Sequence, residues 1–302
     1  MKIALDPWMI RNNPLERVCQ FAAETGYQWI ELSPREDFLP LYAAPQANAE
    51  RIAALKKSLR GHGMGLASLW TVYRWSEPND SEAREMAVRY WKHVIQIAVE
   101  LECFHLNSEF SGRPDAAEAS KASFWRSMEE LVPILEKEHI VMSIEPHPGD
   151  FVEDGNSAVD LIRDIGSSQI KYLYCAPHTF HMGGDMAGMI RYAASLLTHV
   201  HVADTLDHRI PVRYILNPPD SMARVHQHTN IGEGELDWDA FFRTLREIGF
   251  DVRAGGDSYN DTSMLSAANR GVLFRCPDNV AREFPQFRRT DTYEELWQSL
   301  LE

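Results

Sequence analysis

The sequence predicts an α/β fold, a closed (β/α)8 barrel of parallel strands followed by a C-terminal extension. Short apolar, β-branched runs alternate with longer helical patterns along the whole chain, which favours parallel strands joined by helices. The chain has 302 residues, a normal length for such a barrel with extra C-terminal elements. An open doubly wound sheet is the alternative, because a count of strands does not establish that the sheet closes.

Each predicted strand is a short apolar run between polar turn residues. In chain order the strands are Lys2–Asp6, Trp29–Ser33, Gly65–Thr71, Phe104–Asn107, Val141–Glu145, Lys171–Cys175, Val200–Ala203 and Val252–Asp257. The predicted helices are Leu15–Glu24, Ala49–His62, Ser81–Leu101, Ala119–Glu138 and Asp237–Ile248. Two capping boxes, Ser157 with Asp160 and Thr292 with Glu295, indicate further helix starts.

The composition indicates a soluble, acidic protein. The formal net charge is −14, which argues against a nucleic-acid surface because phosphate binding needs a basic field. No apolar run reaches the roughly 18 residues of a membrane span, and the N-terminus lacks a secretory signal pattern. Cys19, Cys103, Cys175 and Cys276 are scattered, which is typical of a reducing cytoplasm. We expect a cytoplasmic protein with no nucleic-acid or membrane partner, and a homo-oligomer stays open.

The segment after residue 261 exceeds what an eight-stranded barrel needs. It shows a helix, a strand, a short helix and a final helix, over Thr262–Ala268, Gly271–Arg275, Asp278–Phe284 and Thr292–Leu301. We expect this segment to complete or decorate the barrel. The stretch Ile210–Ala223 is rich in Pro and Asn and is predicted to be a long loop, on the face of the barrel where loops carry function.

Polar residues at the carboxyl ends of the predicted strands mark a candidate site, because these ends meet at the mouth of a parallel barrel. Glu145 ends the run Val-Met-Ser-Ile-Glu, and Pro146 stops the strand. A charge there is costly unless it is paired or metal-bound, so a salt bridge across the mouth is the alternative to a metal ligand. The other strand-end residues are Glu31, Trp70, Asn107, Glu109, His147, Cys175, His178, His201 and Asp204.

Histidines support the metal interpretation. Period-two alternation in His-Val-His-Val-Ala-Asp places both histidines of that run, the second of which is His201, on one side of the strand. Imidazole mixed with carboxylate suits Mn²⁺, Co²⁺, Zn²⁺ or Fe²⁺, so the conjunction of His201 with Glu145 and His178 favours a metal site. His226 and His228 either line the site from the long loop or are solvated loop residues.

These motifs, in this order and spacing, resemble the xylose-isomerase-like TIM barrels, the sugar isomerase/epimerase superfamily that includes endonuclease IV. The resemblance covers residues 1 to about 252. It rests on Ile-Glu-Pro-His around Glu145, Cys-Ala-Pro-His at 175–178, His-Val-His-Val-Ala-Asp at 199–204 and Gly-Glu-Gly-Glu-Leu-Asp-Trp at 232–238. Within this superfamily, the opening Met-Lys-Ile-Ala-Leu-Asp-Pro and the later run Ile-Glu-Leu-Ser-Pro-Arg at 30–35 resemble members linked to inositol or related sugar catabolism.

The resemblance implies a divalent metal held by a glutamate, an aspartate, a histidine and a glutamate on strands five to eight. The matching positions are Glu145, Cys175, His201 and Asp257, and the implied ion is Mn²⁺, Zn²⁺, Co²⁺ or Mg²⁺. Cys175 departs from the pattern, since a thiolate binds zinc or iron but is a poor ligand for Mg²⁺ or Mn²⁺. Its alternative role is a small buried residue at a site that has lost or rearranged its metal. Asp257 is one methylene shorter than the expected glutamate.

Residues 255–302 resemble the end of a different fold, a haloacid-dehalogenase-type (HAD-like) phosphatase of the phosphoserine phosphatase/homoserine phosphotransferase branch. The likeness rests on Gly-Asp-Ser-Tyr-Asn-Asp at 256–261, Thr-Ser-Met-Leu and Gly-Val-Leu-Phe, and implies that Asp257 and Asp261 once helped to hold Mg²⁺. The required upstream Asp-x-Asp has one candidate, Asp237-Trp-Asp239, only about 20 residues earlier. We therefore reject phosphatase activity and predict a chimera, with residues 1–254 forming the barrel and residues 255–302 a HAD-like segment.

The barrel resemblance implies a metal-dependent isomerase or epimerase that acts on a small sugar, polyol or inositol-derived ketose by proton transfer. Glu145 and Asp257 would exchange the proton on opposite faces of the substrate. A catalytically impaired or binding-only barrel is the alternative, and abasic-site nuclease activity would need a basic groove. The residues expected to contact substrate are Trp70, Asn107, Glu109, His147, His178, Asp204, His226 and His228.

Overall fold

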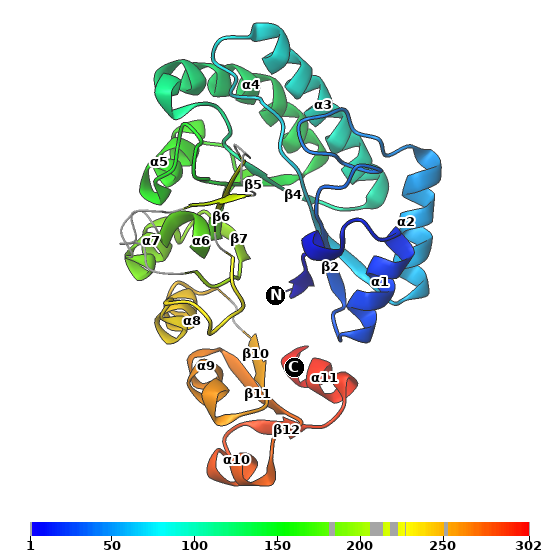
Figure 1. The fold of residues 1–302 in the computed structure, drawn as a ribbon, viewed down its shortest axis with the longest axis vertical. Helices are drawn as coiled ribbons and strands as arrows, with labels where there is room; N and C mark the ends of the chain where they lie inside the picture. Colours follow the sequence, from blue (N-terminus) through cyan, green and yellow to red (C-terminus); the bar gives the residue numbers. More distant parts are fainter. Residues whose placement is uncertain are drawn as a thin grey trace.

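The computed structural model describes residues 2–180, 185–205, 214–217, 223–226, 228–250 and 253–301. Its main sheet has seven parallel strands in chain order, and helices cover the outer side of the curved sheet (Figure 1). The strands are β1 (Ala4–Leu5), β2 (Trp29–Leu32), β3 (Gly65–Trp70), β4 (His105–Glu109), β5 (Val141–Glu145), β6 (Ile170–Cys175) and β7 (Leu197–His201). The helices of this part are α1 (Leu15–Glu24), α2 (Ala49–Gly61), α3 (Ser81–Leu101), α4 (Ala117–Glu138), α5 (Gly155–Ile165), α6 (Ala176–Thr179), α7 (Met186–Ala193) and α8 (Trp238–Glu247).

Side-chain caps determine where several helices begin. The Asp154 carboxylate accepts a hydrogen bond from the backbone N–H of Ser157 at 3.0 Å, so α5 starts at Gly155. The predicted capping box of Ser157 with Asp160 is therefore wrong, because Ser157 already lies inside the first turn. The predicted box at α11 is confirmed: Glu295 N–H donates to Thr292 Oγ1 and Thr292 N–H donates to Glu295 Oε2, both at 3.2 Å.

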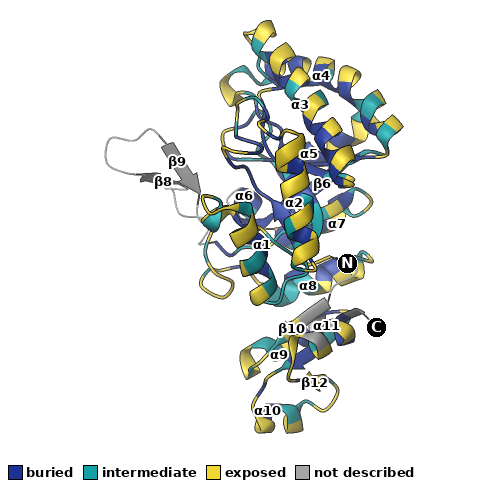
Figure 2. Ribbon diagram, turned by 90° about the vertical axis from the view of Figure 1, so that its right-hand side faces the viewer, coloured by how far each residue is buried: buried dark blue, intermediate teal, exposed yellow. Residues whose placement is uncertain are grey.

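The hydrophobic core lies between the curved sheet and the helices, whose exposed residues face outward (Figure 2). Its largest aromatic group lies beneath α3 and α4. Trp75 stacks on Trp91 with ring centroids 4.9 Å apart, and Phe124 meets Trp75 edge-on at 5.7 Å. The indole N–H of Trp75 donates to the carbonyl of Phe110 at 3.0 Å, which satisfies its only polar group. This cluster anchors the segments that follow β3 and β4.

The described barrel sheet ends at β7, and the predicted eighth strand belongs elsewhere. β10 (Arg253–Gly256) pairs in parallel with β11 (Arg270–Phe274), which pairs in parallel with β12 (Arg288–Thr290). The predicted closed eight-stranded barrel is therefore wrong. In the described structure β10 takes β11 as its strand neighbour, at the edge of a separate three-stranded sheet, and pairs with neither β7 nor β1. Crossovers and the chain end are formed by α9 (Thr262–Ala267), α10 (Asp278–Glu283) and α11 (Tyr293–Leu301).

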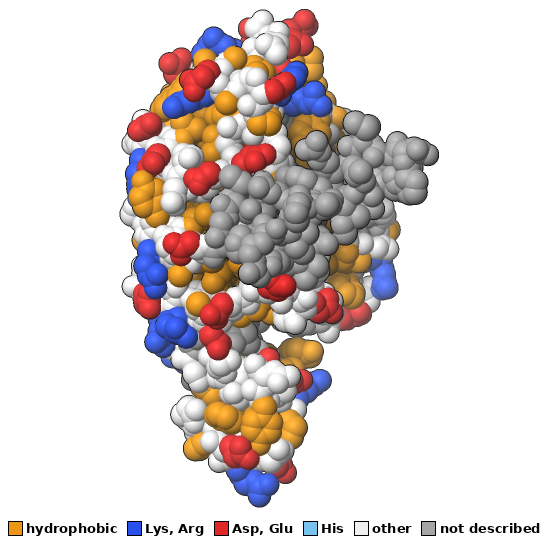
Figure 3. All heavy atoms as spheres, turned by 60° about the vertical axis from the view of Figure 1, so that its left-hand side comes forward, with side chains coloured by type: hydrophobic (Ala, Val, Ile, Leu, Met, Phe, Trp, Pro, Cys, Tyr) orange, Lys and Arg blue, Asp and Glu red, His pale blue; other side chains and the backbone are white. Residues whose placement is uncertain are grey.

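The predicted long loop contains a hairpin. Its residues 214–217 form β8 (Tyr214–Asn217), which pairs antiparallel with β9 (Ala223–His226) at and beyond the end of the predicted loop, while residues 206–213, 218–222 and 227 lie outside the described part. On the face drawn in Figure 3, acidic and basic side chains are interspersed over the described surface, without a continuous basic stripe. No helix in the described ranges is long and apolar enough to cross a membrane.

The C-terminal unit, residues 253–301, contacts the rest of the chain through α9 and through Tyr293. α9 lies against α8, where Arg246 Nη1 donates to the carbonyl of Ser266 at 3.4 Å. The Tyr293 ring lies against Gly26, at the end of α1: a Cβ built on Gly26 would stand 2.6 Å from Tyr293 Cδ1. Only a residue without a side chain fits beneath this ring.

We expect Gly26→Ala to lower the free energy of unfolding by about 2 kcal/mol, because the added methyl overpacks against Tyr293 and the backbone has a left-handed φ of +89°. Gly63→Ala is the matched control, since Gly63 also has a positive φ, +65°, but has nothing within 4 Å of a built Cβ. Urea unfolding of both variants separates the cost of the clash with Tyr293 from the cost of placing alanine at a positive φ. Equal losses would mean that the Tyr293 contact adds nothing to stability.

Candidate functional site

The carboxyl ends of the parallel strands bring polar side chains together at one edge of the curved sheet. Glu145 ends β5, Cys175 ends β6 and His201 ends β7, all at the same edge of the sheet. One ligand atom from each of these three residues lies within 4.8 Å of the others. Three of the four residues predicted to hold a metal therefore meet.

Glu145 is fully buried, and its two oxygens differ in their surroundings. Oε2 lies 3.1 Å from Nδ1 of His178 and 3.5 Å from Nδ1 of His201. Among the described residues, Oε1 has no hydrogen-bond partner. A buried carboxylate oxygen without a donor is costly, so this atom is available to a ligand or to a proton.

Glu31 on β2 holds His201 from across the barrel. Its Oε1 lies 2.7 Å from His201 Nε2, its Oε2 lies 3.2 Å from His199 Nε2, and Ser68 and Asn107 donate to the same Oε2. The sequence placed Glu31 at the barrel mouth without this role. The sequence did show one charged residue between Ile30 and Leu32 in an otherwise apolar strand. It did not show that the partner of Glu31 is His201, which lies five strands further along the sheet.

The electrostatics of this group centre on His201. Burial alone would lower the pKa of His201, but the carboxylates of Glu31 and Glu145 raise it well above its usual value. Burial raises the pKa of Glu31, but the charges of His201 and His199 outweigh this and leave it well below the usual range. Without a bound ion, His201 is thus an imidazolium bridging two carboxylates, which is the salt-bridge arrangement considered for Glu145.

Cys175, His178 and His228 form a second group, which has Cys175 in common with the first. Cys175 Sγ lies 3.6 Å from His228 Nε2, and one ligand atom from each of the three residues lies within 4.8 Å of the others. Burial, together with the nearby charge of Glu145, raises the pKa of Cys175 to about 12. Burial lowers the pKa of His178 to about 3 despite Glu145, so His178 is a neutral imidazole.

Glu109, His147 and Asp150 form a third group at the ends of β4 and β5. His147 Nε2 lies 3.8 Å from Glu109 Oε1, and Asp150 Oδ2 accepts the backbone N–H of Ser111 at 2.7 Å. Asp150 was missed in the sequence because it follows its strand by five residues. A turn, not a strand end, carries it back to the mouth.

Two of the residues predicted to contact substrate are fully buried. Asp204 is fully buried, and its oxygens accept hydrogen bonds from four groups of its own loop, which leaves no room for substrate. These donors are the N–H groups of Thr205, Gly232 and Leu236 and the indole of Trp238. Asn107 is also fully buried and donates to Glu31 beneath the site. The Asp204 prediction is therefore wrong, whereas Asn107 keeps an Oδ1 without a partner among the described residues and its contact with substrate stays a prediction.

Asp257 does not reach the cluster. It follows β10 in the C-terminal unit, is exposed, and its backbone N–H donates to Asp261 Oδ2 at 2.9 Å. The prediction that it supplies the last ligand and second base fails because β10 pairs within its own sheet. Trp70 lies at the end of β3, edge-on to Trp8 at 6.4 Å, and belongs to none of the ligand groups among the described residues. The side chain of His226 lies outside the described part.

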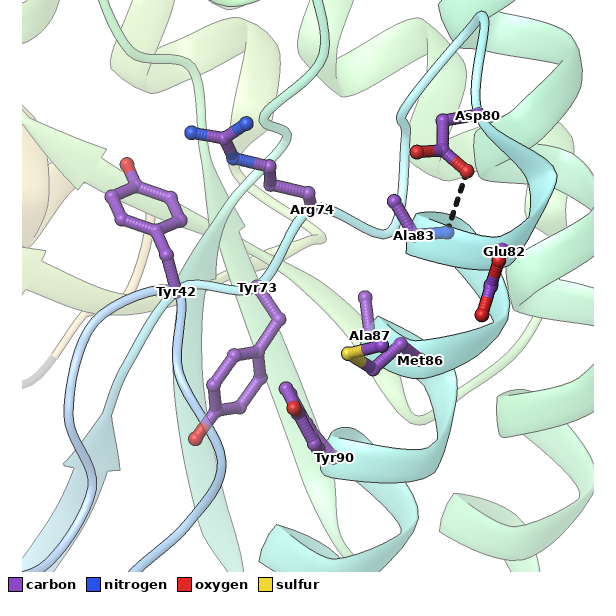
Figure 4. A pocket seen from close by; sticks show the side chains of 9 residues that line it. All are labelled: Tyr42, Tyr73, Arg74, Asp80, Glu82, Ala83, Met86, Ala87 and Tyr90. Atoms are coloured by element: carbon purple, nitrogen blue, oxygen red, sulfur yellow. Dashed lines mark hydrogen bonds between the residues drawn. The ribbon is translucent and has the colours of Figure 1, made fainter.

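A pocket of about 200 Å³ lies between the segment after β3 and the start of α3 (Figure 4). The Arg74 guanidinium stands 5.4 Å from the centroid of the Tyr42 ring on one side, and Asp80 caps α3 on the other. Among the described residues, none that lines this pocket belongs to a ligand group. The candidate chemistry therefore lies at the strand ends.

A curved parallel α/β sheet with carboxylate, thiol and imidazole groups at its strand ends defines a TIM-barrel-like α/β protein with candidate metal-ligand groups. The family model described as a xylose isomerase-like TIM barrel matches residues 19–259, and the chain belongs to this family. The inosose isomerase of Bacillus velezensis is 22% identical over 246 residues, which cover 80% of this chain and 82% of that protein.

Two solved structures share the fold. D-psicose 3-epimerase with D-tagatose, from Clostridium cellulolyticum H10, has a TM-score of 0.65 and 15% identity, covering 90% of this chain and 84% of that one. The IOLI protein with a bound zinc atom has a TM-score of 0.64 and 16% identity, covering 100% of this chain and 95% of that one.

A short stretch of the chain also matches a different class of protein. Phosphoserine phosphatase ThrH of Pseudomonas aeruginosa is 53% identical over 57 residues, which are 19% of this chain and 28% of that protein. A phosphoserine phosphatase of Pseudomonas syringae is 52% identical over 52 residues. The chain thus spans only about a quarter of the length of these two phosphatases.

Proposed function

We propose that the chain is a divalent-metal-dependent isomerase of a small sugar, polyol or inositol-derived ketose. The observation that carries the proposal is the convergence of Glu145, Cys175 and His201 at the ends of three consecutive strands. The xylose isomerase-like family and the inosose isomerase relative support the substrate class. Glu145, Cys175 and His201 would hold the ion.

The donor set fits zinc best. A thiolate, an imidazole and a carboxylate are all zinc ligands, whereas a thiolate is a poor ligand for Mg²⁺. His201 offers Nδ1, because its Nε2 is bound to Glu31 at 2.7 Å, an arrangement that orients a metal-binding imidazole. The buried Cys175 thiol lies against His228, which can accept its proton as the thiolate forms. A divalent ion in such a site polarises a substrate carbonyl and acidifies the adjacent C–H.

Isomerisation fits the described carboxylates better than epimerisation does. Inverting one carbon needs a proton acceptor and a proton donor on opposite faces of the substrate, and Asp257 is not present to serve the second face. Moving a proton between adjacent carbons on one face needs a single base. Glu145 would serve as this base through Oε1, while Oε2, which lies 3.1 Å from Nδ1 of His178, would bind the ion.

The test is an isotope experiment with the zinc-loaded protein. Inososes and keto-sugars are incubated with it in D₂O, and NMR follows their conversion. We expect one or more substrates to convert with part of the original protium moved to the neighbouring carbon, because a fully buried base exchanges its proton slowly with solvent. Chelation should stop conversion and zinc should restore it. Zinc binding without any conversion across the panel would overturn the isomerase assignment.

A binding-only barrel is the second candidate, and the observation that favours it is the position of Asp257 outside the site. In that case the protein would bind zinc and a polyol but exchange no carbon-bound proton. The isotope experiment separates the two functions directly.

We further infer that residues 255–302 derive from a phosphoserine phosphatase by fusion with a barrel, natural or constructed. The 53% identity to ThrH, set against 22% identity between the barrel and its relative, supports this origin. The two motif aspartates now serve the local fold, since Asp261 Oδ2 accepts the N–H groups of Asp257 and Ser258. The phosphatase core is absent from the matched stretch, so we propose no phosphatase activity.

A further inference from the structure

The pocket at the start of α3 has charged groups on two sides and apolar side chains between them. Its volume is about 200 Å³, below the roughly 300–1,000 Å³ of pockets that enclose drug-sized ligands, so it suits a single ring. Figure 4 shows the Arg74 guanidinium on the side of Tyr42, and the carboxylates of Asp80 and Glu82 on the side of α3. The lining between them comes from Tyr73, Met86, Ala87 and Tyr90.

Aromatic rings supply most of the apolar surface of this pocket. Tyr73 is buried and meets Tyr90 edge-on, with ring centroids 5.4 Å apart. Tyr42 is 52% exposed, so much of its ring is open to water. A ligand that covers such rings with C–H groups removes apolar surface from water on both partners. The pocket therefore favours a ring that has an apolar face.

The charged groups of the pocket do not pair with one another. Within the described ranges Arg74 is exposed and forms no ion pair, and its guanidinium lies over the Tyr42 ring, 5.4 Å from the centroid. Asp80 Oδ1 accepts the backbone N–H of Ala83 at 2.9 Å, and Glu82 is exposed. The two carboxylates would repel an anion and Arg74 would repel a cation, whereas a hydroxyl group both donates and accepts. The lining therefore suits a neutral, polyhydroxylated ring.

Tyr42 has an unusual backbone conformation at the edge of the pocket. Its φ is +57°, in the left-handed region that bulky residues rarely adopt. Glu102 and His139 also have positive φ values, but they end α3 and α4, where a left-handed residue is common. Tyr42 ends no described helix, and its N–H donates to the carbonyl of Val72 at 3.0 Å. A strained backbone that fixes an exposed ring is typical of binding sites.

Ser111 links the pocket to the polar groups at the strand ends. Its N–H donates to Asp150 Oδ2 at 2.7 Å, and its Oγ donates to the carbonyl of Tyr73 at 3.5 Å. One residue thus spans the space between the pocket wall and the strand-end groups. Burial raises the pKa of Tyr42, and the charges of Glu109 and Asp150 add to this effect, so the Tyr42 phenol also lies near those groups.

We propose that this pocket is a subsite for a neutral sugar ring, and that the substrate is a glycoside whose second ring reaches the strand-end groups. Tyr42 and Tyr73 would cover the apolar face of the first ring, while Arg74 and Glu82 would bind its hydroxyls. The assignment deepens the proposed function and rests on it for the reaction of the second ring, but not for the binding of the first. A ligand that fills both places should bind more tightly than a single ring.

The experiment measures the affinity of the full-length protein for sugars by isothermal titration calorimetry. The two-ring probes are maltose, cellobiose, sucrose and trehalose, and D-glucose is the one-ring probe. We expect at least one disaccharide to bind at least about 10-fold more tightly than D-glucose. Ala83→Phe, which fills the pocket from α3, and Arg74→Gln, which removes a charged hydrogen-bond donor, should each lower that affinity about 10-fold.

Arg89→Gln is the matched control, because Arg89 is an exposed arginine of α3 outside the pocket lining of the described structure. Its affinity for the disaccharide should equal that of the wild type. Since Arg74 is exposed, Arg74→Gln tests the pocket even if Ala83→Phe does not fold. The proposal is overturned if no disaccharide binds more tightly than D-glucose, or if the folded pocket variants bind it as the wild type does. Failure of the isomerase assignment would appear only as absent proton transfer.

Discussion

Glu145→Gln is expected to lower the turnover of the zinc-loaded protein by about 1,000-fold or more. The substitution keeps the shape of the side chain but removes the basic oxygen, and general-base catalysis contributes about 10²- to 10⁴-fold. It also removes one negative zinc ligand, so zinc affinity should fall together with turnover. The isotope assay measures the first effect and equilibrium dialysis the second.

Glu118→Gln is the control for this prediction, because Glu118 is an exposed glutamate in the first turn of α4. Its turnover should equal that of the wild type. A pure salt-bridge role for Glu145 would give a different result: the variant would unfold at lower urea concentration but keep its turnover. That outcome would show that Glu145 stabilises the fold but takes no part in the reaction.

Trp75→Ala is expected to lower the free energy of unfolding by about 4 kcal/mol, within the range for truncating a large aromatic residue in a core. Trp75 is fully buried, stacks on Trp91 and meets Phe124 edge-on. The truncation leaves a cavity bounded by both rings. It also removes a donor from the carbonyl of Phe110, which keeps its hydrogen bond from Ser76. Urea unfolding measures the loss.

Phe104→Ala is the comparison, since Phe104 is 52% exposed and its truncation opens no enclosed cavity. We expect a loss below about 1 kcal/mol. Similar losses for the two variants would contradict the view that the aromatic cluster beneath α3 and α4 anchors this half of the barrel.

Local signals predicted most of the elements. α1 and α3 have the predicted bounds, and β5 and β6 end at the predicted Glu145 and Cys175. The bounds of these elements depend on the spacing of apolar residues and on turn residues, and both can be identified within a short stretch of sequence. The eighth strand was mispredicted because the choice between β7 and β11 as a partner for β10 depends on tertiary structure.

The site was predictable where a residue ends a strand and not where its role depends on a distant partner. Glu145, Cys175 and His201 meet as predicted because parallel strands finish at one edge. Asp204 is also a carboxylate close to the end of a strand, yet hydrogen bonds from its own loop occupy its oxygens. Asp150 reached the mouth through a turn. Residue type and strand position do not distinguish these cases.

The ligand groups of the described structure draw on β2 and on β4 to β7 with their following segments, and none draws on β10. Exchange of the last strand–helix unit for foreign sequence therefore leaves these residues in place. The proposed fusion would thus cost the barrel none of these ligand residues. A lineage that acquired an unrelated tail there would keep the ligand residues of its ancestor and lose only what the eighth strand had supplied.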